Sequence, residues 1–228
     1  MPGPASSAAN RAHLLPAPAS RSSLVIAALS ALGVAALYLV FVANPLGQLI
    51  DTDAMHAVMS HASALRAPAA RVLDTITLRT VLIGTVAAAI VALLRRRPAT
   101  AAAALAVVGA ANLTTQLLKV SLSRPWALNG DTNSLPSGHV TAAASVVAAA
   151  LLVTAPRWRW MTAAIGATWL AAVSAGVVVA GWHRPSDVAA ALLVTASITA
   201  LTTHLLRHRT LSTRHTPPHR APATRQTR

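Results

Sequence analysis

The chain contains no cysteine, and charged and aromatic residues are scarce. Without cysteine, neither a disulfide nor a thiolate metal site can form. Only 11% of the residues are charged and 3% are aromatic, whereas 54% are hydrophobic, chiefly alanine, valine and leucine. This composition is more typical of a membrane bundle built on small residues than of a soluble core.

Acidic residues are especially few, because 19 basic residues stand against five acidic ones and the formal net charge is +14. A charge of this size is typical of proteins that bind nucleic acid. Here, however, most arginines lie in short clusters beside apolar runs, which is a pattern of membrane topology. We therefore expect no nucleic acid partner.

Six apolar runs indicate helices that cross a bilayer core about 30 Å thick. They cover residues 24–43, 77–94, 100–118, 140–155, 161–180 and 188–206. We predict an all-α bundle of six transmembrane helices at 24–206, a disordered tail at 1–23 and a basic cytoplasmic tail at 207–228. The first run is interpreted as a retained span, since no clear signal-peptide cleavage site follows it.

The segment 44–76 is mixed in character, and its apolar residues recur at helical spacing. This spacing predicts an amphipathic helix lying at the membrane interface. The residues concerned are Met55, Val58, Met59, Ala62, Ala69, Val72 and Leu73.

Six spans place both chain ends on one side of the membrane, and the basic residues divide unequally between the sides. Thirteen lie on the side of the termini, which the positive-inside rule makes cytoplasmic: Arg11, Arg21, Arg95, Arg96, Arg97, Arg157, Arg159, Arg207, Arg209, Arg214, Arg220, Arg225 and Arg228. All five aspartates then lie outside, and the alanine- and arginine-rich composition suggests a bacterial plasma membrane.

The stretch from Ser134 to His139 is strongly polar and stands directly before an apolar run. Pro136 suits the first turn of a helix, where its missing N–H costs nothing. The N–H groups of Ser137, Gly138 and His139 would then be unpaired donors at a helix start, which attracts phosphate. His139 can give or take a proton near neutral pH.

Two further segments carry groups that phosphoryl transfer requires. Lys119 and Arg124 supply positive charge, although either side chain alone also suits an interfacial anchor. Asp187 follows His183 by four residues and can fix its tautomer, leaving the other ring nitrogen free to attack phosphorus. The alternatives for this pair are a structural contact between spans or a metal site, and no third ligand at suitable spacing supports the metal.

In these motifs the chain resembles the type 2 phosphatidic acid phosphatase (PAP2) superfamily, which also includes vanadium haloperoxidases. The resemblance covers about residues 77–206 and rests on Pro136-Ser137-Gly138-His139 and on Gly181-x-His183-x-Pro185-x-Asp187.

The resemblance implies a metal-independent membrane phosphatase that needs no cofactor and acts on a lipid phosphate or diphosphate. Polyprenyl diphosphate, phosphatidic acid and phosphatidylglycerol phosphate are the candidate substrates. His183 would form a phosphohistidine, Asp187 would orient it, and His139 would protonate the leaving group. The expected phosphate-binding residues are Lys119, Arg124, Ser137, Gly138 and Arg184.

The chain departs from the family pattern at two positions. Four residues separate Lys119 from Arg124, where the family usually has six, and Trp126 stands at the usual arginine position. The third motif usually begins Ser-Arg, but this chain has Gly176 and Val177 there. We hypothesise that Arg184 partly replaces the missing arginine.

Two other functions stay open. Val177 motivates the first, a non-catalytic phospholipid-binding protein. The second is a phosphotransferase that passes phosphate to an alcohol instead of water.

The charge distribution generates a topological prediction. A cysteine introduced at Asn133 should react with a membrane-impermeant thiol reagent in intact cells, because the positive-inside rule places this segment outside. A cysteine at Arg96 serves as the control and should react only after lysis. The reverse labelling pattern would contradict an outward-facing site.

Overall fold

The computed structural model describes residues 18–122, 124–125 and 133–213, and every regular element in these ranges is helical. The elements in chain order are α1 (Pro18–Phe41), α2 (Pro45–His61), η2 (Ser63–Leu65), α3 (Arg66–Leu73), α4 (Leu78–Leu94), α5 (Pro98–Ser121), α6 (Gly138–Val153), η4 (Pro156–Trp158), α7 (Arg159–Val179) and α8 (Pro185–Thr213). The prediction of an all-α fold is confirmed.

Several helix starts follow local sequence signals. Asn44 caps α2 by accepting hydrogen bonds from two N–H groups of its first turn. Thr77 and Thr80 form a capping box at the start of α4. Pro98 and Pro185 are the first residues of α5 and α8, a position where proline lacks only an N–H that the helix would leave unpaired.

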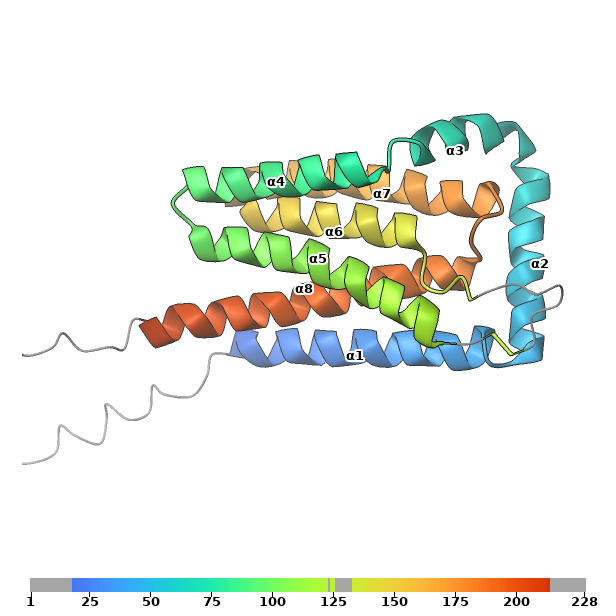
Figure 1. Cartoon of the computed structure of the whole chain (residues 1–228), viewed down its shortest axis with the longest axis horizontal. Helices are drawn as coiled ribbons and strands as arrows, with labels where there is room; N and C mark the ends of the chain where they lie inside the picture. Colours follow the sequence, from blue (N-terminus) through green and yellow to red (C-terminus); the bar gives the residue numbers. More distant parts are fainter. Residues whose placement is uncertain (1–17, 123, 126–132, 214–228) are drawn as a thin grey trace, which may run out of the picture.

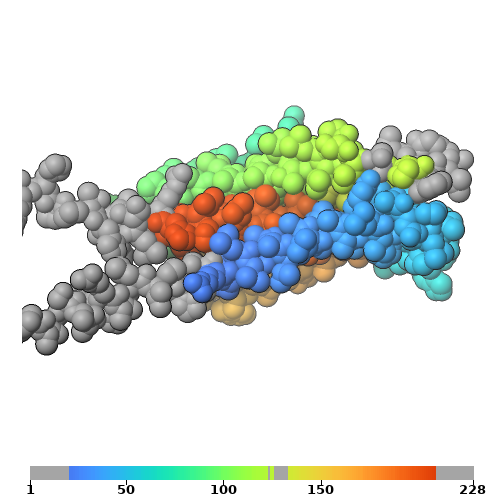
Figure 2. All heavy atoms as spheres, turned by 90° about the horizontal axis from the view of Figure 1, so that it is seen from below, coloured from blue at the N-terminus to red at the C-terminus, as the bar shows by residue number. Residues whose placement is uncertain are grey.

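Six apolar helices, α1 and α4 to α8, run along the length of the molecule (Figure 1). α6 is the central helix and packs against α4, α5, α7 and α8. α1 lies along α8 on one face of the bundle (Figure 2). Small residues make this close packing possible, because alanine dominates the buried side chains between α4, α5 and α6.

The six helices are not equally suited to span a bilayer. Four are long and apolar enough alone, namely 21–41, 98–121, 156–179 and 185–208, and the pair 63–73 and 78–94, bent by 56°, gives a fifth. α6 has 16 residues, or about 24 Å of helix, which is shorter than a bilayer core. α6 is surrounded by α4, α5, α7 and α8, and its N-terminal end lies short of the ends of α7 and α8 (Figure 1).

Several helices extend beyond the predicted spans. α1 begins at Pro18, within the tail predicted as disordered at 1–23, and α8 continues to Thr213, within the predicted C-terminal tail. α5 continues to Ser121, so Lys119 lies in the last helical turn and not in the following loop. The extra turn matters, because a helix fixes the direction of the Lys119 side chain.

The segment 44–76 forms two helices joined by a 3-10 turn, where one helix was expected. α2 crosses the end of the bundle at a steep angle to the other helices (Figure 1). Most of the apolar stripe packs against the protein: Met55 and Leu73 are buried against Val173 and Val177 of α7, and Met59 and Val72 pack on the same cluster. The exposed large aliphatic residues of α2 are Leu46, Leu49, Ile50 and, from the stripe itself, Val58.

The start of α1 and the end of α8 lie at the same end of the bundle (Figure 1). The corner at Arg95–Arg97 joins α4 to α5 at this end, where Arg95 donates a hydrogen bond to the Val153 carbonyl at 2.6 Å. The basic clusters thus gather at one end, and α2 covers the other. This arrangement agrees with an even number of crossings.

The corner between α1 and α2 gives a prediction about stability. A Cβ atom on Gly47 would clash with the Val40 carbonyl oxygen, and relieving the clash requires a shift of the backbone. Gly47→Ala should therefore destabilise the protein by about 1–3 kcal/mol or more and lower the midpoint of thermal unfolding in detergent. Gly109→Ala is the control, because a Cβ atom on Gly109 would meet no other atom within 4 Å. Equal midpoints for the two variants would contradict the packing at this corner.

Candidate active site

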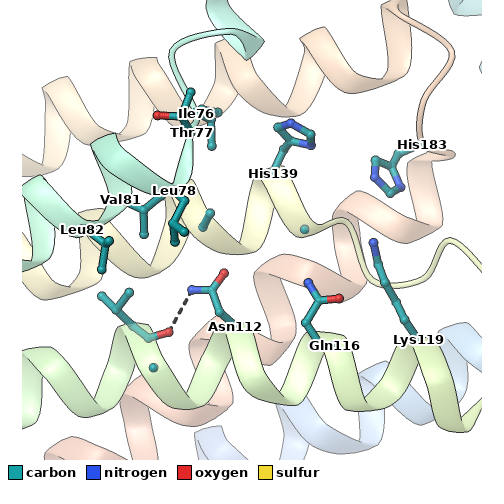
Figure 3. A pocket seen from close by; sticks show the side chains of 14 residues that line it. Ile76, Thr77, Leu78, Val81, Leu82, Asn112, Gln116, Lys119, His139 and His183 are labelled. Carbon is teal, nitrogen blue, oxygen red and sulfur yellow. Dashed lines mark hydrogen bonds between the residues drawn. The ribbon is translucent and has the colours of Figure 1, made fainter.

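Three polar segments that are distant in the sequence meet at the end of the bundle that α2 covers. They are the last turn of α5 with the residues after it, the start of α6, and the connection between α7 and α8. Figure 3 shows Lys119, His139 and His183, one from each segment, around a single cavity. The structure therefore brings together the residues that the motifs group.

The start of α6 differs from the expectation by two residues. Ser137 is the N-cap and Gly138 is the first helical residue, so Pro136 precedes the helix. The Ser137 N–H donates to the Asp187 carbonyl at 3.0 Å, and its fully buried hydroxyl caps the helix. Within the described part of the chain, the N–H groups of Gly138 and His139 are the unpaired donors of this helix start.

Gly138 keeps open the space in front of these donors. A Cβ atom there would lie 3.8 Å from Lys119 Nζ and 4.0 Å from Gln116 Nε2. The partial positive charge of the helix N-terminus and the ammonium group of Lys119 therefore face the same volume. Together they form a suitable environment for an anion.

The end of α7 turns the chain back toward the cavity through a Schellman motif. The N–H groups of Gly181 and Trp182 donate to the carbonyls of Val178 and Val177 at 2.9 and 3.0 Å. Gly181 has a φ of +75°, a conformation that glycine adopts without strain. The His183 N–H also donates to Val177, at 3.2 Å, so His183 is fixed by the helix end.

The Asp187 carboxylate is fully buried and connects the three segments. Its Oδ2 accepts hydrogen bonds from Ser134 Oγ at 2.7 Å and from the Arg184 N–H at 3.0 Å. His183 Nδ1 lies 3.2 Å from the same oxygen. Oδ1 faces the buried guanidinium of Arg124, with Nη2 at 3.9 Å. One carboxylate thus holds the two histidine-bearing segments and the residues after α5 in register.

The contact between His183 and Asp187 selects a tautomer. With its proton on Nδ1, the ring donates to the carboxylate and keeps a lone pair on Nε2. The ring lines the cavity, which gives Nε2 a place to act as a nucleophile. His139 lines the same cavity and lies against Trp182, with the ring centroids 5.3 Å apart.

The cavity has a volume of about 590 Å³ and two chemically different halves. Its polar half contains Lys119, His139 and His183, with Gln116 beside them (Figure 3). Its apolar half lies between α4 and α5 over α6 and is lined by Leu78, Val81, Leu82, Val108 and Ala142, among others. Leu78 and Leu82 are exposed, so the apolar half reaches the lateral surface of the bundle.

Four of the predicted site residues lie behind the cavity wall: Arg124, Ser137, Arg184 and Asp187 do not line it. The Arg184 guanidinium lies against α2, where its Nε donates to Thr52 Oγ1 at 2.9 Å. Its Nη1 lies 3.4 Å from Ser134 Oγ. In this arrangement Arg184 reaches Asp187 through Ser134.

Val177, which stands where the motif usually has arginine, is fully buried in an apolar cluster to which α2, α3, α6, α7 and α8 contribute. The site therefore contains no guanidinium from this part of α7. Trp126, the residue at the other departure from the motif, lies outside the described residues.

Several contributors to the site were not among the predicted site residues. Asn112 and Gln116 of the apolar run 100–118 were expected only to face neighbouring helices or a cavity, and both line this cavity with Lys119 along one helix face. Ser134 adjoins the recognised motif, but nothing local predicts its bond to Asp187. Asp51 and Thr52 of α2 lie more than 130 residues from their partners in the sequence.

No group of three or more histidine, cysteine, aspartate or glutamate side chains that could hold a metal ion occurs in residues 18–122, 124–125 and 133–213. The carboxylate nearest to His183 is already bonded to the protein.

Comparison with known families decides what kind of site this is. The sequence profile of the PAP2 superfamily matches residues 75–211, more than half of the chain and all three polar segments. The chain belongs to the PAP2 superfamily. Family membership makes it a PAP2-type phosphatase, as the motifs predicted.

The fold of this PAP2 protein also occurs among solved structures. It is similar to the crystal structure of the first transmembrane PAP2-type phosphatidylglycerolphosphate phosphatase from Bacillus subtilis, with a TM-score of 0.63 and 18% sequence identity. The similarity covers 82% of this chain and 96% of the other. A comparison with curated proteins gave no match.

Proposed function

We propose that this PAP2 protein hydrolyses a lipid phosphate monoester or diphosphate through a phosphohistidine on His183. The observation that carries the proposal is the orientation of this ring: Nδ1 lies 3.2 Å from the buried Asp187 carboxylate, and the ring lines the cavity that contains Lys119 and His139. A nucleophile, its orienting group, a cation and a second proton-transfer group are then present at one site.

The reaction has two steps. In the first, His183 Nε2 attacks the terminal phosphorus, the bond from this phosphorus to the leaving oxygen breaks, and protonated His139 gives its proton to that oxygen. The leaving group is the lipid alcohol for a monoester and the lipid monophosphate for a diphosphate. In the second, neutral His139 takes a proton from water while the water oxygen attacks phosphorus. The phosphorus–nitrogen bond breaks, inorganic phosphate leaves, and His183 is regenerated.

Charge on the transferred phosphoryl group needs donors in fixed positions. Lys119 and the N–H groups of Gly138 and His139 face the cavity and would contact its oxygens directly. Arg124 and Arg184 would contribute positive charge from behind the wall, and Ser137 would hold the helix start that presents the N–H groups.

The shape of the cavity supports a lipid substrate. A phosphate at the polar half places the remainder of the molecule in the apolar half, which opens toward the membrane at Leu78 and Leu82. An acyl or prenyl chain matches such a surface, because its methylene groups lose contact with water there. Phosphatidylglycerol phosphate, phosphatidic acid and polyprenyl diphosphate all have this form.

We further propose that the site faces the outside of a bacterial plasma membrane. The basic corners gather at the opposite end of the bundle, and basic residues favour the cytoplasm. The substrate would then be presented in the outer leaflet.

The purified protein should release inorganic phosphate from at least one lipid of a panel containing the three candidates. His183→Ala should reduce release to background, since the nucleophile is lost. Turnover should persist in EDTA and fall at both low and high pH, because one histidine must be neutral and the other protonated. Loss of turnover in EDTA that a divalent ion restores would contradict the mechanism.

Replacing Arg184 tests whether it contributes to phosphate stabilisation. Arg184→Lys should lose on the order of tenfold in kcat/KM, which corresponds to a contact of about 1.4 kcal/mol. Lysine keeps the charge but cannot reproduce the paired contacts to Thr52 and Ser134. Arg157→Lys, at the opposite end of the bundle, is the control. Wild-type kcat/KM in Arg184→Ala would exclude the contribution.

A further inference from the structure

α2 crosses the end of the bundle directly over the connection between α7 and α8 (Figure 1). This helix precedes residues 75–211, the part of the chain that the PAP2 profile covers. Any contribution of α2 to the site therefore comes from residues outside the part of the chain that matches the family.

Asp51 of α2 is 3% exposed and binds the first turn of α8. Its Oδ1 accepts the Ser186 N–H at 3.1 Å, and its Oδ2 accepts the Ser186 hydroxyl. The Ser186 N–H belongs to the group of donors that a helix start leaves unpaired. Asp51 thus caps α8 from another helix, with a negative charge where the helix dipole favours one.

The next residue of α2 holds the same connection at a second point. Thr52 Oγ1 accepts a hydrogen bond from Arg184 Nε at 2.9 Å. Arg184 and Ser186 lie between His183 and Asp187 in the sequence, so α2 binds both residues that flank Pro185. Hydrogen bonds from α2 therefore fix the backbone between His183 and Asp187.

Ionising the Asp51 carboxyl in this position is unfavourable compared with ionising it in water. Burial raises the pKa of the Asp51 carboxyl, and the nearby Asp187 carboxylate raises it further, while the Ser186 hydrogen bonds and the Arg184 charge act in the opposite direction. Because the pKa of Asp51 is raised in the folded state, its contribution to the free energy of unfolding is present at low pH. That contribution is lost as the pH rises through the folded-state pKa. At neutral pH, a neutral acceptor would be less costly to bury.

We propose that Asp51 is a positioning residue, which holds Ser186 so that the His183 ring and the Asp187 carboxylate keep their catalytic separation. This inference rests on the proposed function of the same site. A displacement of the loop by a fraction of an ångström would misdirect Nε2, and the rate of in-line attack depends steeply on such geometry.

Three variants separate positioning from a purely structural role. Asp51→Ala removes both acceptors. Asp51→Asn keeps an acceptor for the Ser186 N–H and is neutral. Asp53→Ala is the matched control, because Asp53 is exposed on the same helix. Each purified variant is assayed for kcat per folded molecule and KM on the lipid that the wild type hydrolyses, for orthovanadate affinity, and for thermal unfolding at pH 7.

Asp51→Ala should lower kcat per folded molecule on the order of tenfold or more with KM little changed, and should weaken orthovanadate binding by a similar factor. Asp51→Asn should retain most of the wild-type kcat and orthovanadate affinity. Its midpoint of thermal unfolding should be no lower than that of the wild type. Asp53→Ala should match the wild type throughout.

Equal kcat and equal orthovanadate affinity for Asp51→Ala and Asp53→Ala would overturn the positioning role, even if Asp51→Ala unfolds earlier. If the wild type hydrolyses no lipid phosphate, the proposed function fails, and orthovanadate affinity alone decides. Weaker binding in Asp51→Ala with recovery in Asp51→Asn supports positioning, and equal binding contradicts it.

Discussion

The organisation of the site depends on one buried carboxylate, that of Asp187. An ionised carboxylate away from water is stable only when hydrogen bonds and opposite charge replace its hydration. Here Ser134, His183 and the Arg184 N–H donate to one oxygen, and Arg124 faces the other. Because these partners come from three segments, satisfying one charge fixes the relative positions of all three. The hydrogen bonds and charge that stabilise buried Asp187 therefore also fix the geometry of the candidate site.

The other main feature of the site is a cavity that has a polar end and an apolar opening at the side of the bundle. α6 is too short to span the bilayer alone, and its N-terminus lies at the base of a cavity whose walls are α4 and α5. Polar donors are thus presented beside an apolar surface that opens laterally. A substrate with a phosphate at one end and a long apolar chain can satisfy both surfaces without leaving the membrane. A soluble phosphate ester would leave the apolar half unfilled.

Features that depend on residues close together in the sequence could be predicted, whereas contacts between distant segments could not. Apolar runs predicted the long helices, since span length depends on composition alone, and the spacing of four residues predicted the contact between His183 and Asp187. Most of the apolar stripe of 44–76 packs against the core beside α7, and periodicity alone does not say whether a stripe faces the protein or the membrane interface. The direction of the Arg184 side chain and the hydrogen bonds between Asp51 and Ser186 depend on α2, which lies over 130 residues earlier. Rules based on sequence spacing do not predict contacts at that separation.

The central claim is that His183 forms a covalent bond to phosphorus, and a rapid-quench measurement tests it most directly. The purified protein is mixed with a lipid phosphate that it hydrolyses, and the reaction is quenched in alkali to preserve phosphoramidate bonds. The protein is then digested and analysed by mass spectrometry. The account predicts a phosphate on the peptide containing His183, appearing before free phosphate and absent in His183→Ala. Turnover without any phosphorylated histidine, or with the phosphate on His139 instead, would contradict it.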